Sequence, residues 1–447
     1  MPKKATKKVT RLKSMGVEEA EANAGVDFAA LFDKAMDSVA KKAGVDATEL
    51  DGNLKAALVG VPFNNLALEV AFSENVLNLG RLYCLDGLQE SCKSSFMWEL
   101  ARITDRANGF NLVIDTEHKA TENLGQGIVG YSAYPRIQFK SPASFEQALQ
   151  IVTSTVEAIT KAPKGKTFPT LIGFDSAQGS AADAEIKNID KDGTSGRSFP
   201  LPALLMAKYL PYVTSKISSL PIALFIVRHA RLEASKMPGV MTAVAKGANE
   251  LGFNAYKTFY MTATKVVQAA NFGSRTVKIQ TKKGTGEGVV IPVPLRWSDE
   301  ILTHDDHTIE SRRHFVFDWP AATFQLLTKP ESCYVPTRVI KALKLVLGSM
   351  TTNAGKVSNK ALGLDKASPQ ELHDALYDPT NAVLLSQLRA ALNIRVGQAF
   401  RNGDNFDDLK SKQRAIILGR SDTNFKVEGE GEIPDLDTDE DETQTDE

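Results

Sequence analysis

The sequence contains few cysteines and no long apolar run. Its three cysteines, Cys84, Cys92 and Cys333, are too few for a disulfide framework and do not have the spacing of a zinc site. No apolar stretch reaches the roughly 18 residues of a membrane span. The basic N-terminal stretch "MPKKATKKVTRLK" lacks the apolar region of a secretory signal. These absences predict a soluble protein of the reducing cytoplasm, with no membrane partner.

The charge is unevenly distributed. The segment Glu428–Glu447 carries eleven acids and no lysine or arginine, so the rest of the chain is +10 although the whole chain is −1. Met1–Lys13 holds six of the positive charges and no acid. A basic arm and an acidic tail often accompany nucleic-acid binding. The other interpretation is two solvated, disordered termini, and the two interpretations are compatible.

Apolar strands alternate with amphipathic helices through the first half of the chain. Such strands separated by helices predict an α/β fold with a parallel sheet covered on both faces. We expect strands at Arg81–Gly87, Phe110–His118, Pro169–Ser176 and Pro221–Ala230, and helices over Lys93–Arg106, Phe145–Ile159 and Ala203–Ser219. Two segments without periodicity, 177–198 and 231–254, are predicted to be irregular loops.

The second half changes character. It is strand-like from Tyr256 to Trp297 and mostly helical from Val335 to about Ala415. Within it, Ser368 precedes Glu371 by three residues, the spacing of a capping box at a helix N-terminus. The sequence therefore predicts a smaller helical domain at the C-terminal end.

The stretch "CLDGLQESCKSS" is close to the phosphate-binding pattern G-x-x-x-x-G-K-[ST]. Gly87 supplies the first glycine and Lys93-Ser94 the end, but Cys92 stands where the pattern has its second glycine. The setting between a strand and a helix is what such a loop requires. Backbone N–H groups from Gln89 onward are expected to surround a phosphate at the helix N-terminus. Taken alone, this incomplete pattern is a weak signal.

Polar residues also end three other strands. Asp175 ends "LIGFD", as a magnesium-binding carboxylate does beside a phosphate loop. Glu117 follows "VIDT", where a carboxylate orients an attacking water. Arg228 and His229 end "FIVRH" and are placed to contact a γ-phosphate. Each residue alone reads as an ordinary turn residue, but ligands of open α/β sheets bind at the carboxyl ends of the strands.

The order and spacing of these motifs resemble the RecA/UvsX-type recombinases, the ATP-driven DNA strand-exchange proteins. The resemblance rests on "GRLYCLDGLQESCKSSFMWEL", "NLVIDTEHKA", "PTLIGFDSAQG" and "IALFIVRHAR", and covers about Val61–Arg296. The junction "YLPYVTSKISSLP" is most similar to the phage branch, which is expected to lack the glycine before the lysine. The resemblance implies a RecA-like P-loop NTPase core with a mostly parallel central sheet flanked by helices. The expected parts are a basic disordered arm (1–14), an N-terminal helical oligomerisation segment (15–60), the ATPase core (61–300), a small helical C-terminal domain (301–427) and an acidic disordered tail (428–447).

The resemblance also implies roles for individual residues. Glu117 and Lys93 are similar to the catalytic pair, and Ser94 and Asp175 to the Mg²⁺ ligands. The implied nucleotide-binding residues are Gly87, Gln89, Glu90, Ser91, Cys92, Lys93, Ser94, Ser95, Asp175, Arg228 or His229, and, across a subunit interface, Lys278, Lys282 and Lys283. The implied DNA loops are Gly179–Phe199 and Leu232–Gly252, with Arg197, Arg231, Lys236, Met237, Met241, Lys246 and Asn249 as DNA-binding residues.

The implied function is an ATP-dependent homologous recombinase that forms helical filaments on single-stranded DNA and exchanges strands with duplex DNA. Its cofactors are ATP and Mg²⁺, and its partners are DNA, further copies of the chain, and single-strand-binding and mediator proteins. Its location is the cytoplasm, that of the host if a phage encodes it. Two alternatives stay open: a replicative helicase with a RecA core, and an ATP-binding filament protein that has lost turnover through Cys92.

Overall fold

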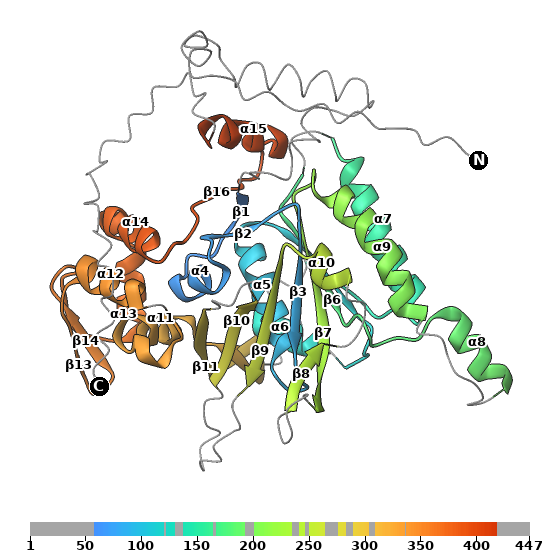
Figure 1. Cartoon of the computed structure of the whole chain (residues 1–447), viewed down its shortest axis with the longest axis horizontal. Coiled ribbons are helices and arrows are strands. Elements are labelled where there is room, and N and C mark those ends of the chain that lie inside the picture. The colour runs from blue at the N-terminus through green and yellow to red at the C-terminus, as the bar shows by residue number, and fades with distance from the viewer. Residues whose placement is uncertain are drawn as a thin grey trace, which may run out of the picture. The chain divides into compact units, whose positions relative to one another are not determined.

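A large, mostly parallel sheet runs through the protein, which we describe from a computed structural model (Figure 1). The structure describes residues 58–119, 122–129, 137–163, 167–192, 201–234, 241–245, 250–263, 276–282, 289–303, 309–335 and 337–417. Within these ranges the sheet has ten strands in the order β12-β11-β10-β9-β3-β7-β6-β4-β5, with β8 paired to β7. The α/β class and the parallel central sheet predicted from the sequence are confirmed.

The parallel strands carry the functional edge. They are β3 (Arg81–Gly87), β4 (Phe110–Asp115), β5 (Ile137–Lys140), β6 (Thr170–Asp175), β7 (Ile222–Ala234) and β9 (Lys257–Ala263). The strands β10 (Thr276–Lys282), β11 (Val290–Thr303) and β12 (Ile309–Phe317) continue the sheet in antiparallel pairing. Along β3, Tyr83 and Leu85 join one apolar core while Leu82 and Cys84 join another, so both faces of the sheet are covered.

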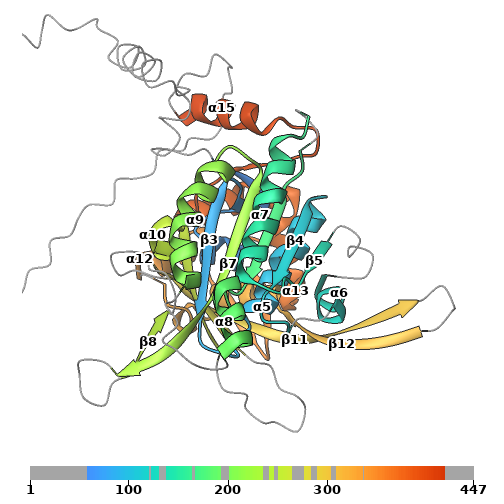
Figure 2. The same cartoon turned by 90° about the vertical axis from the view of Figure 1, so that its right-hand side faces the viewer.

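Helices cover the two faces of the sheet. On one face lie α5 (Lys93–Arg106) and α6 (Glu122–Val129), and on the other α7 (Phe145–Thr160) and α9 (Leu201–Ile217) (Figure 2). In α5, Phe96 and Leu100 are fully buried, at the spacing that predicted this helix. Burying a side chain of this size contributes about 1.5–3 kcal/mol, so the apolar stripe fixes the helix against the sheet. The predicted bounds of α5 are confirmed residue for residue.

Two segments predicted to be irregular contain regular structure, so that prediction was wrong. The first includes α8 (Asp183–Asp192), whose first turns are mostly exposed, so it lacks the apolar stripe that announces a helix. In the second, β7 runs on to Ala234 and pairs with β8 (Met241–Ala245), and α10 (Glu250–Asn254) follows. Alanines recur along both paired segments, and their low strand propensity concealed the hairpin.

The C-terminal part is helical with one small sheet. The predicted capping box is confirmed at the start of α13: Ser368 caps the helix and the Glu371 carboxylate accepts from the Ser368 N–H at 2.6 Å. The sheet β13-β14-β15 was not predicted, because its β13–β14 turn uses Ala354-Gly355 at positive φ instead of Asn-Gly or Asp-Gly. The elements are α11 (Trp319–Thr328), η2 (Pro330–Ser332), α12 (Thr337–Leu347), β13 (Met350–Asn353), β14 (Lys356–Asn359), β15 (Leu364–Ala367), α13 (Pro369–Tyr377), η3 (Pro379–Asn381), α14 (Ala382–Ala391) and α15 (Phe406–Ile417).

A second small sheet joins the two ends of the described chain. Strand β1 (Val59–Pro62) pairs with β2 (Val76–Asn78) on one side and with β16 (Gln398–Ala399) on the other. Between β1 and β2 lies α4 (Leu66–Phe72), whose buried Glu69 accepts two hydrogen bonds of 2.7 Å from Arg389. The C-terminal elements are therefore tied to the start of the core by both backbone and ion-pair contacts.

Most of the predicted domain boundaries lie outside the described residues, and one lies inside a strand. The basic arm (1–14), all but the last residues of the segment 15–60, and the acidic tail (428–447) lie outside the described residues. The expected boundary at 300/301 lies inside β11. Among the described residues, every helix is too short or too polar to traverse a lipid bilayer.

Candidate functional site

The loop between β3 and α5 has the strand–loop–helix setting predicted for a phosphate-binding loop. It begins at Gly87, where an added Cβ would lie 2.6 Å from the carbonyl oxygen of Met261 on β9 and 2.6 Å from Ser91 Oγ. Any side chain at this position would collide with backbone that cannot yield, so the loop requires glycine here. Ser91 closes the turn by donating to the carbonyl of Leu88 at 2.8 Å.

Cys92 occupies the last position before the helix in a left-handed conformation. Its φ is 63° and its ψ 27°, the region that glycine enters without steric cost. For a non-glycine residue this region costs about 1–3 kcal/mol. The loop therefore keeps a glycine-like backbone at the position where the phosphate-loop pattern has glycine, and Cys92 packs its small side chain against the core.

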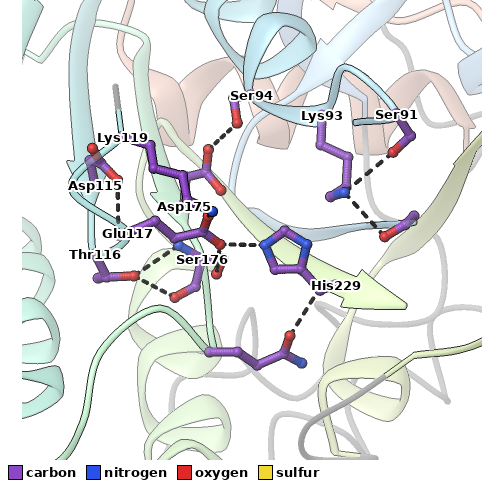
Figure 3. Close-up of polar contacts among 12 residues, drawn as sticks. Ser91, Lys93, Ser94, Asp115, Thr116, Glu117, Lys119, Asp175, Ser176 and His229 are labelled. Atoms are coloured by element: carbon purple, nitrogen blue, oxygen red, sulfur yellow. Dashed lines mark hydrogen bonds and ion pairs between the residues drawn. The ribbon is translucent and has the colours of Figure 1, made fainter. Parts of the chain in front are cut away.

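Lys93 lies buried beneath the loop. Its Nζ donates to the carbonyl oxygens of Gly87 at 3.1 Å and Leu88 at 2.6 Å. It also donates to Ser91 Oγ at 3.3 Å (Figure 3). Burial lowers the pKa of Lys93, while the nearby carboxylates of Asp175 and Glu117 act in the opposite direction. An ammonium held by neutral carbonyls and a hydroxyl keeps its positive charge available for an anionic ligand in the loop.

Ser94 and Asp175 meet beside the same loop. Ser94 Oγ donates to Asp175 Oδ2 at 2.5 Å, which joins the first turn of α5 to the end of β6 (Figure 3). Burial raises the pKa of Asp175 to about 6, and the charges of Glu117 and Asp115 add to this shift. Within the part of the chain that the structure describes, no cationic side chain forms an ion pair with the Asp175 carboxyl group.

The donors at this position fit a hard divalent cation. A hydroxyl and a carboxylate are oxygen ligands of the kind Mg²⁺ prefers, and Mg²⁺ usually completes its shell with water and substrate phosphates. No group of three His, Cys, Asp or Glu side chains is close enough to bind a metal in the described part of the chain. The residues therefore fit Mg²⁺ bound jointly with phosphate, and do not form a protein-only metal cage.

Glu117 follows the end of β4 and is held by three side chains. Its Oε1 accepts from Ser176 Oγ at 2.6 Å and is paired with His229 Nε2, and its Oε2 accepts from Lys119 Nζ at 2.9 Å (Figure 3). The hydrogen bond from His229, followed by those from Ser176 and Lys119, holds the pKa of Glu117 well below its usual range. Glu117 is therefore an ionised acceptor at the carboxyl edge of the sheet, the state that a general base requires.

Arg228 and His229, left as alternatives by the sequence, are on different sides of β7. Arg228 is 6% exposed and donates to both carboxylate oxygens of Asp86, on the neighbouring strand β3, at 2.8 Å. The His229 ring instead contacts Glu117, and the backbone N–H of His229 donates to Gln178 Oε1 at 3.1 Å. In this geometry His229 is the residue that faces the site, while Arg228 is engaged within the sheet.

The remaining predicted nucleotide residues are more scattered. Gln89 and Glu90 form the exposed tip of the loop, and Ser95 follows in the first turn of α5. Lys278 is exposed on β10, and its partner Thr262 on β9 lies one residue beyond Met261, the partner of Gly87. It thus lies two strands from Gly87, or about 10 Å along the sheet. Lys282 lies four residues further down β10, its side chain is not described, and Lys283 lies outside the described residues.

Little of the predicted DNA-binding set can be placed. Arg231 is exposed on the part of β7 that pairs with β8, opposite Val244. Met241 begins β8, opposite Ala234. The residues outside the described ranges are Arg197, Lys236, Met237, Lys246 and Asn249.

Sequence reasoning missed three polar residues at this site: Thr116, Ser176 and Gln178. Thr116 Oγ1 donates to the carbonyl of Ser176 at 2.7 Å, and Ser176 and Gln178 contact Glu117 and His229 as described above. Each lies within three residues of a predicted site residue, so position relative to the strand ends was the available signal. Their pairing across strands is visible only in the fold.

Comparison with known proteins adds no assignment to this geometry, because neither protein-family models nor curated proteins match the sequence.

Proposed function

We propose that the protein is an ATP-dependent homologous recombinase of the RecA/UvsX type, with ATP bound at the β3–α5 loop and DNA bound at the same edge of the sheet. It forms filaments on single-stranded DNA, pairs them with homologous duplex and hydrolyses ATP between subunits in the cytoplasm. The large parallel sheet flanked by helices is compatible with the RecA-like P-loop core that this proposal requires.

One observation carries the nucleotide part of the proposal. Lys93, the Ser94–Asp175 pair and Glu117 come from three different strand ends and converge at one edge. A cation, a hard-metal ligand pair and an ionised carboxylate are the groups that phosphoryl transfer needs for charge neutralisation, metal binding and water orientation. This convergence supports a nucleoside triphosphatase rather than a protein that has only the sequence motifs of one.

In the proposed reaction, each residue has a defined task. Lys93 leaves its loop carbonyls to neutralise phosphate charge, and the loop N–H groups orient the phosphates. Ser94 and Asp175 would hold Mg²⁺, and the bound ion would supply charge stabilisation for the phosphate oxygens. Glu117 accepts a proton from the attacking water.

The DNA part of the proposal is supported by position. The chain leaves β6 towards α8 and leaves β7 towards β8, so both segments that resemble DNA loops start beside Asp175 and His229. A nucleotide bound at this edge is therefore adjacent to both loop origins. The basic arm and acidic tail of the sequence fit a partner with a phosphate backbone.

The first test is ATP hydrolysis with and without single-stranded DNA. We expect DNA to stimulate hydrolysis, and Lys93→Ala to abolish it while the protein stays folded by circular dichroism. Lys161→Ala, at the exposed C-terminus of α7, is the matched control and should hydrolyse ATP like the wild type. Wild-type hydrolysis by the Lys93→Ala variant would remove the phosphate-loop assignment.

The second test separates a recombinase from a helicase. Electron microscopy of the protein with single-stranded DNA and a non-hydrolysable ATP analogue should show open helical filaments. Closed rings would favour the replicative helicase. Filaments without measurable hydrolysis would favour the protein that binds ATP without turnover.

A further inference from the structure

Two hydroxyl groups lock the ends of β4 and β6 together next to Glu117. Thr116 Oγ1 donates to the carbonyl oxygen of Ser176 at 2.7 Å and accepts from the N–H of Ser176 at 2.9 Å. The N–H of Thr116 donates to the carbonyl of Asp175 at 2.7 Å. Thr116 and Ser176 are both completely buried. The carbonyl of Asp175 and the backbone N–H and carbonyl of Ser176 are thus all bonded to Thr116, the residue preceding Glu117.

Ser176 extends this lock to the Glu117 carboxylate itself. Its Oγ donates to Glu117 Oε1 at 2.6 Å, a short bond from a neutral donor to an ionised acceptor (Figure 3). A side chain as long as glutamate has three rotatable bonds, and a bond to a buried hydroxyl restricts its terminal group. Of the three side chains that hold this carboxylate, Ser176 is the buried neutral donor, whereas His229 and Lys119 contact it from more exposed positions. Ser176 therefore helps to set where the carboxylate lies, and Thr116 sets where Ser176 lies.

The turn that follows Ser176 packs against Thr116 and Glu117 and restricts their movement. Gly179 N–H donates to the carbonyl of Ser176 at 3.2 Å. A Cβ at Gly179 would lie 2.5 Å from Thr116 Oγ1 and 2.7 Å from Glu117 Cγ, so the glycine backbone packs directly on both residues. Displacement of Glu117 on this side is blocked by main chain, which does not yield as a flexible side chain would.

We propose that Thr116 and Ser176 are positioning residues that hold Glu117 in line with the attacking water; this inference rests on the proposed ATPase function. A general base acts only within hydrogen-bond reach of its proton, about 2.6–3.2 Å. A misplacement of about 1 Å costs on the order of 100-fold in rate. Neither Thr116 nor Ser176 touches the reacting atoms, and both act through Glu117.

The test compares turnover with nucleotide affinity in three variants. Ser176→Ala removes the hydrogen bond to Glu117 and keeps the bonds between the Thr116 hydroxyl and the Ser176 backbone. Thr116→Val removes those backbone bonds with little change in side-chain shape. Thr116→Ser keeps the hydroxyl and loses only the methyl group. We expect Ser176→Ala and Thr116→Val to lower kcat by about 10- to 100-fold with the nucleotide Kd within about 2-fold of wild type. Thr116→Ser should recover kcat to within about 3-fold of wild type, because the hydroxyl carries both bonds.

The control is Thr323→Val in α11. Thr323 is equally buried, and its hydroxyl has no hydrogen-bond partner among the described residues. Its replacement should leave kcat unchanged, which separates loss of the specific bonds from general effects of a Thr→Val change in the core.

A second measurement asks whether Ser176 acts through Glu117. In a Glu117→Gln background, adding Ser176→Ala should lower the single-turnover rate by less than about 2-fold, because the base it positions is already gone. A full additional loss there, or an unchanged kcat for Ser176→Ala in the wild-type background, would overturn the inference. A wild-type protein without any hydrolysis would overturn the proposed function, and this inference with it. The Ser176→Ala result stands by itself if Thr116→Val does not fold.

Discussion

Arg228 and Asp86 form a buried two-bonded ion pair between neighbouring strands. Arg228 Nε donates to Asp86 Oδ1 and Nη2 to Asp86 Oδ2, each at 2.8 Å, and the two residues are direct partners in the β3–β7 register. Asp86 immediately precedes Gly87, so the pair lies at the point where the β3–α5 loop leaves the sheet. The next residue on β7, His229, lies on the other side of the strand and contacts Glu117.

The first prediction concerns this ion pair. Arg228→Ala should lower the free energy of unfolding by about 3–5 kcal/mol, because it leaves the Asp86 carboxylate buried and unpaired. Replacing both residues together, by Asp86→Leu with Arg228→Met, should recover most of that loss. Urea unfolding of the three proteins provides the measurement.

Lys119→Ala is the matched control for the ion pair. It removes an ion-pair partner whose side chain is 71% exposed, and it should cost less than about 1 kcal/mol. A loss this small for Arg228→Ala as well would mean that the pair does not stabilise the loop.

The second prediction concerns the left-handed conformation of Cys92. Cys92→Gly should keep the nucleotide Kd within about 2-fold, because glycine adopts the same left-handed backbone conformation without steric cost. Cys92→Val should weaken nucleotide binding at least about 10-fold, since a β-branched side chain strongly disfavours positive φ. Calorimetric titration with a non-hydrolysable ATP analogue measures both.

Cys333→Val is the corresponding control for Cys92. Cys333 is buried but has a φ of −107° and a ψ of 138°, a conformation that valine adopts readily. Equal affinities of the Gly and Val variants at position 92 would show that the loop does not depend on this backbone conformation.

The sequence predicted the elements whose side chains repeat with a clear period. Phe96, Leu100 and Ile103 identified α5 to the residue because one face of that helix is buried along its length. It did not predict α8, whose few apolar residues leave no stripe to detect. Local pattern reports burial, so elements that lie on the surface give little signal.

The candidate site shows the same limit. Lys93, Glu117 and Asp175 were predicted because each lies at the end of a buried strand or shortly after it. That Arg228 pairs with Asp86, 142 residues away in sequence, was not predictable from the pattern. Because successive side chains of a strand alternate, the sequence predicts that Arg228 and His229 lie on opposite faces of the sheet. Only the packed fold shows which of the two faces Glu117.

The third prediction concerns communication between nucleotide and DNA. If His229 reports the nucleotide, single-stranded DNA should bind more tightly with an ATP analogue than with ADP, by about 1–3 kcal/mol. His229→Ala should remove most of this difference, because it removes the contact between Glu117 and the strand that leads to β8. Fluorescence anisotropy with a labelled oligonucleotide in both nucleotide states measures it.

The variant His229→Ala alone is the sharper choice, since a change at Arg228 would also break the ion pair with Asp86. His373→Ala, which removes a histidine on α13 bonded to the carbonyl of Asn64, should keep the full difference. If His229→Ala keeps it as well, the sensor is elsewhere, with the Lys278 region of β10 next to be tested.

The fourth prediction concerns pH and Lys410. Burial, followed by repulsion from Arg81, lowers the pKa of Lys410 from its ordinary 10.5 to about 8. The unfolded chain therefore binds more protons at this residue between pH 8 and 10.5, so its contribution to stability rises as the pH rises through that range. Below pH 8 the charged form in the folded state is disfavoured and the contribution is lowest.

Comparison with Lys410→Met isolates this group from other titrations. The wild type should gain about 1 kcal/mol relative to the variant between pH 8 and 10.5, less than a fully buried lysine would give because Lys410 is only partly shielded from water. Thermal unfolding of both proteins across this range measures the difference. A difference that stays constant with pH would show that Lys410 titrates normally in the folded protein.

The pairing of β1 with β16 has a consequence for how the chain is made. Val59 of β1 pairs with Gln398 of β16, so one partner strand of β1 is synthesised about 340 residues after β1 itself. At synthesis rates of about 5–20 residues per second, that interval is roughly 20–70 seconds. During translation the nascent core exists with one side of β1 uncovered, long after its own residues have left the ribosome. We expect this interval to be the stage at which the growing chain depends most on chaperones, and truncation before Gln398 to leave it in that state permanently.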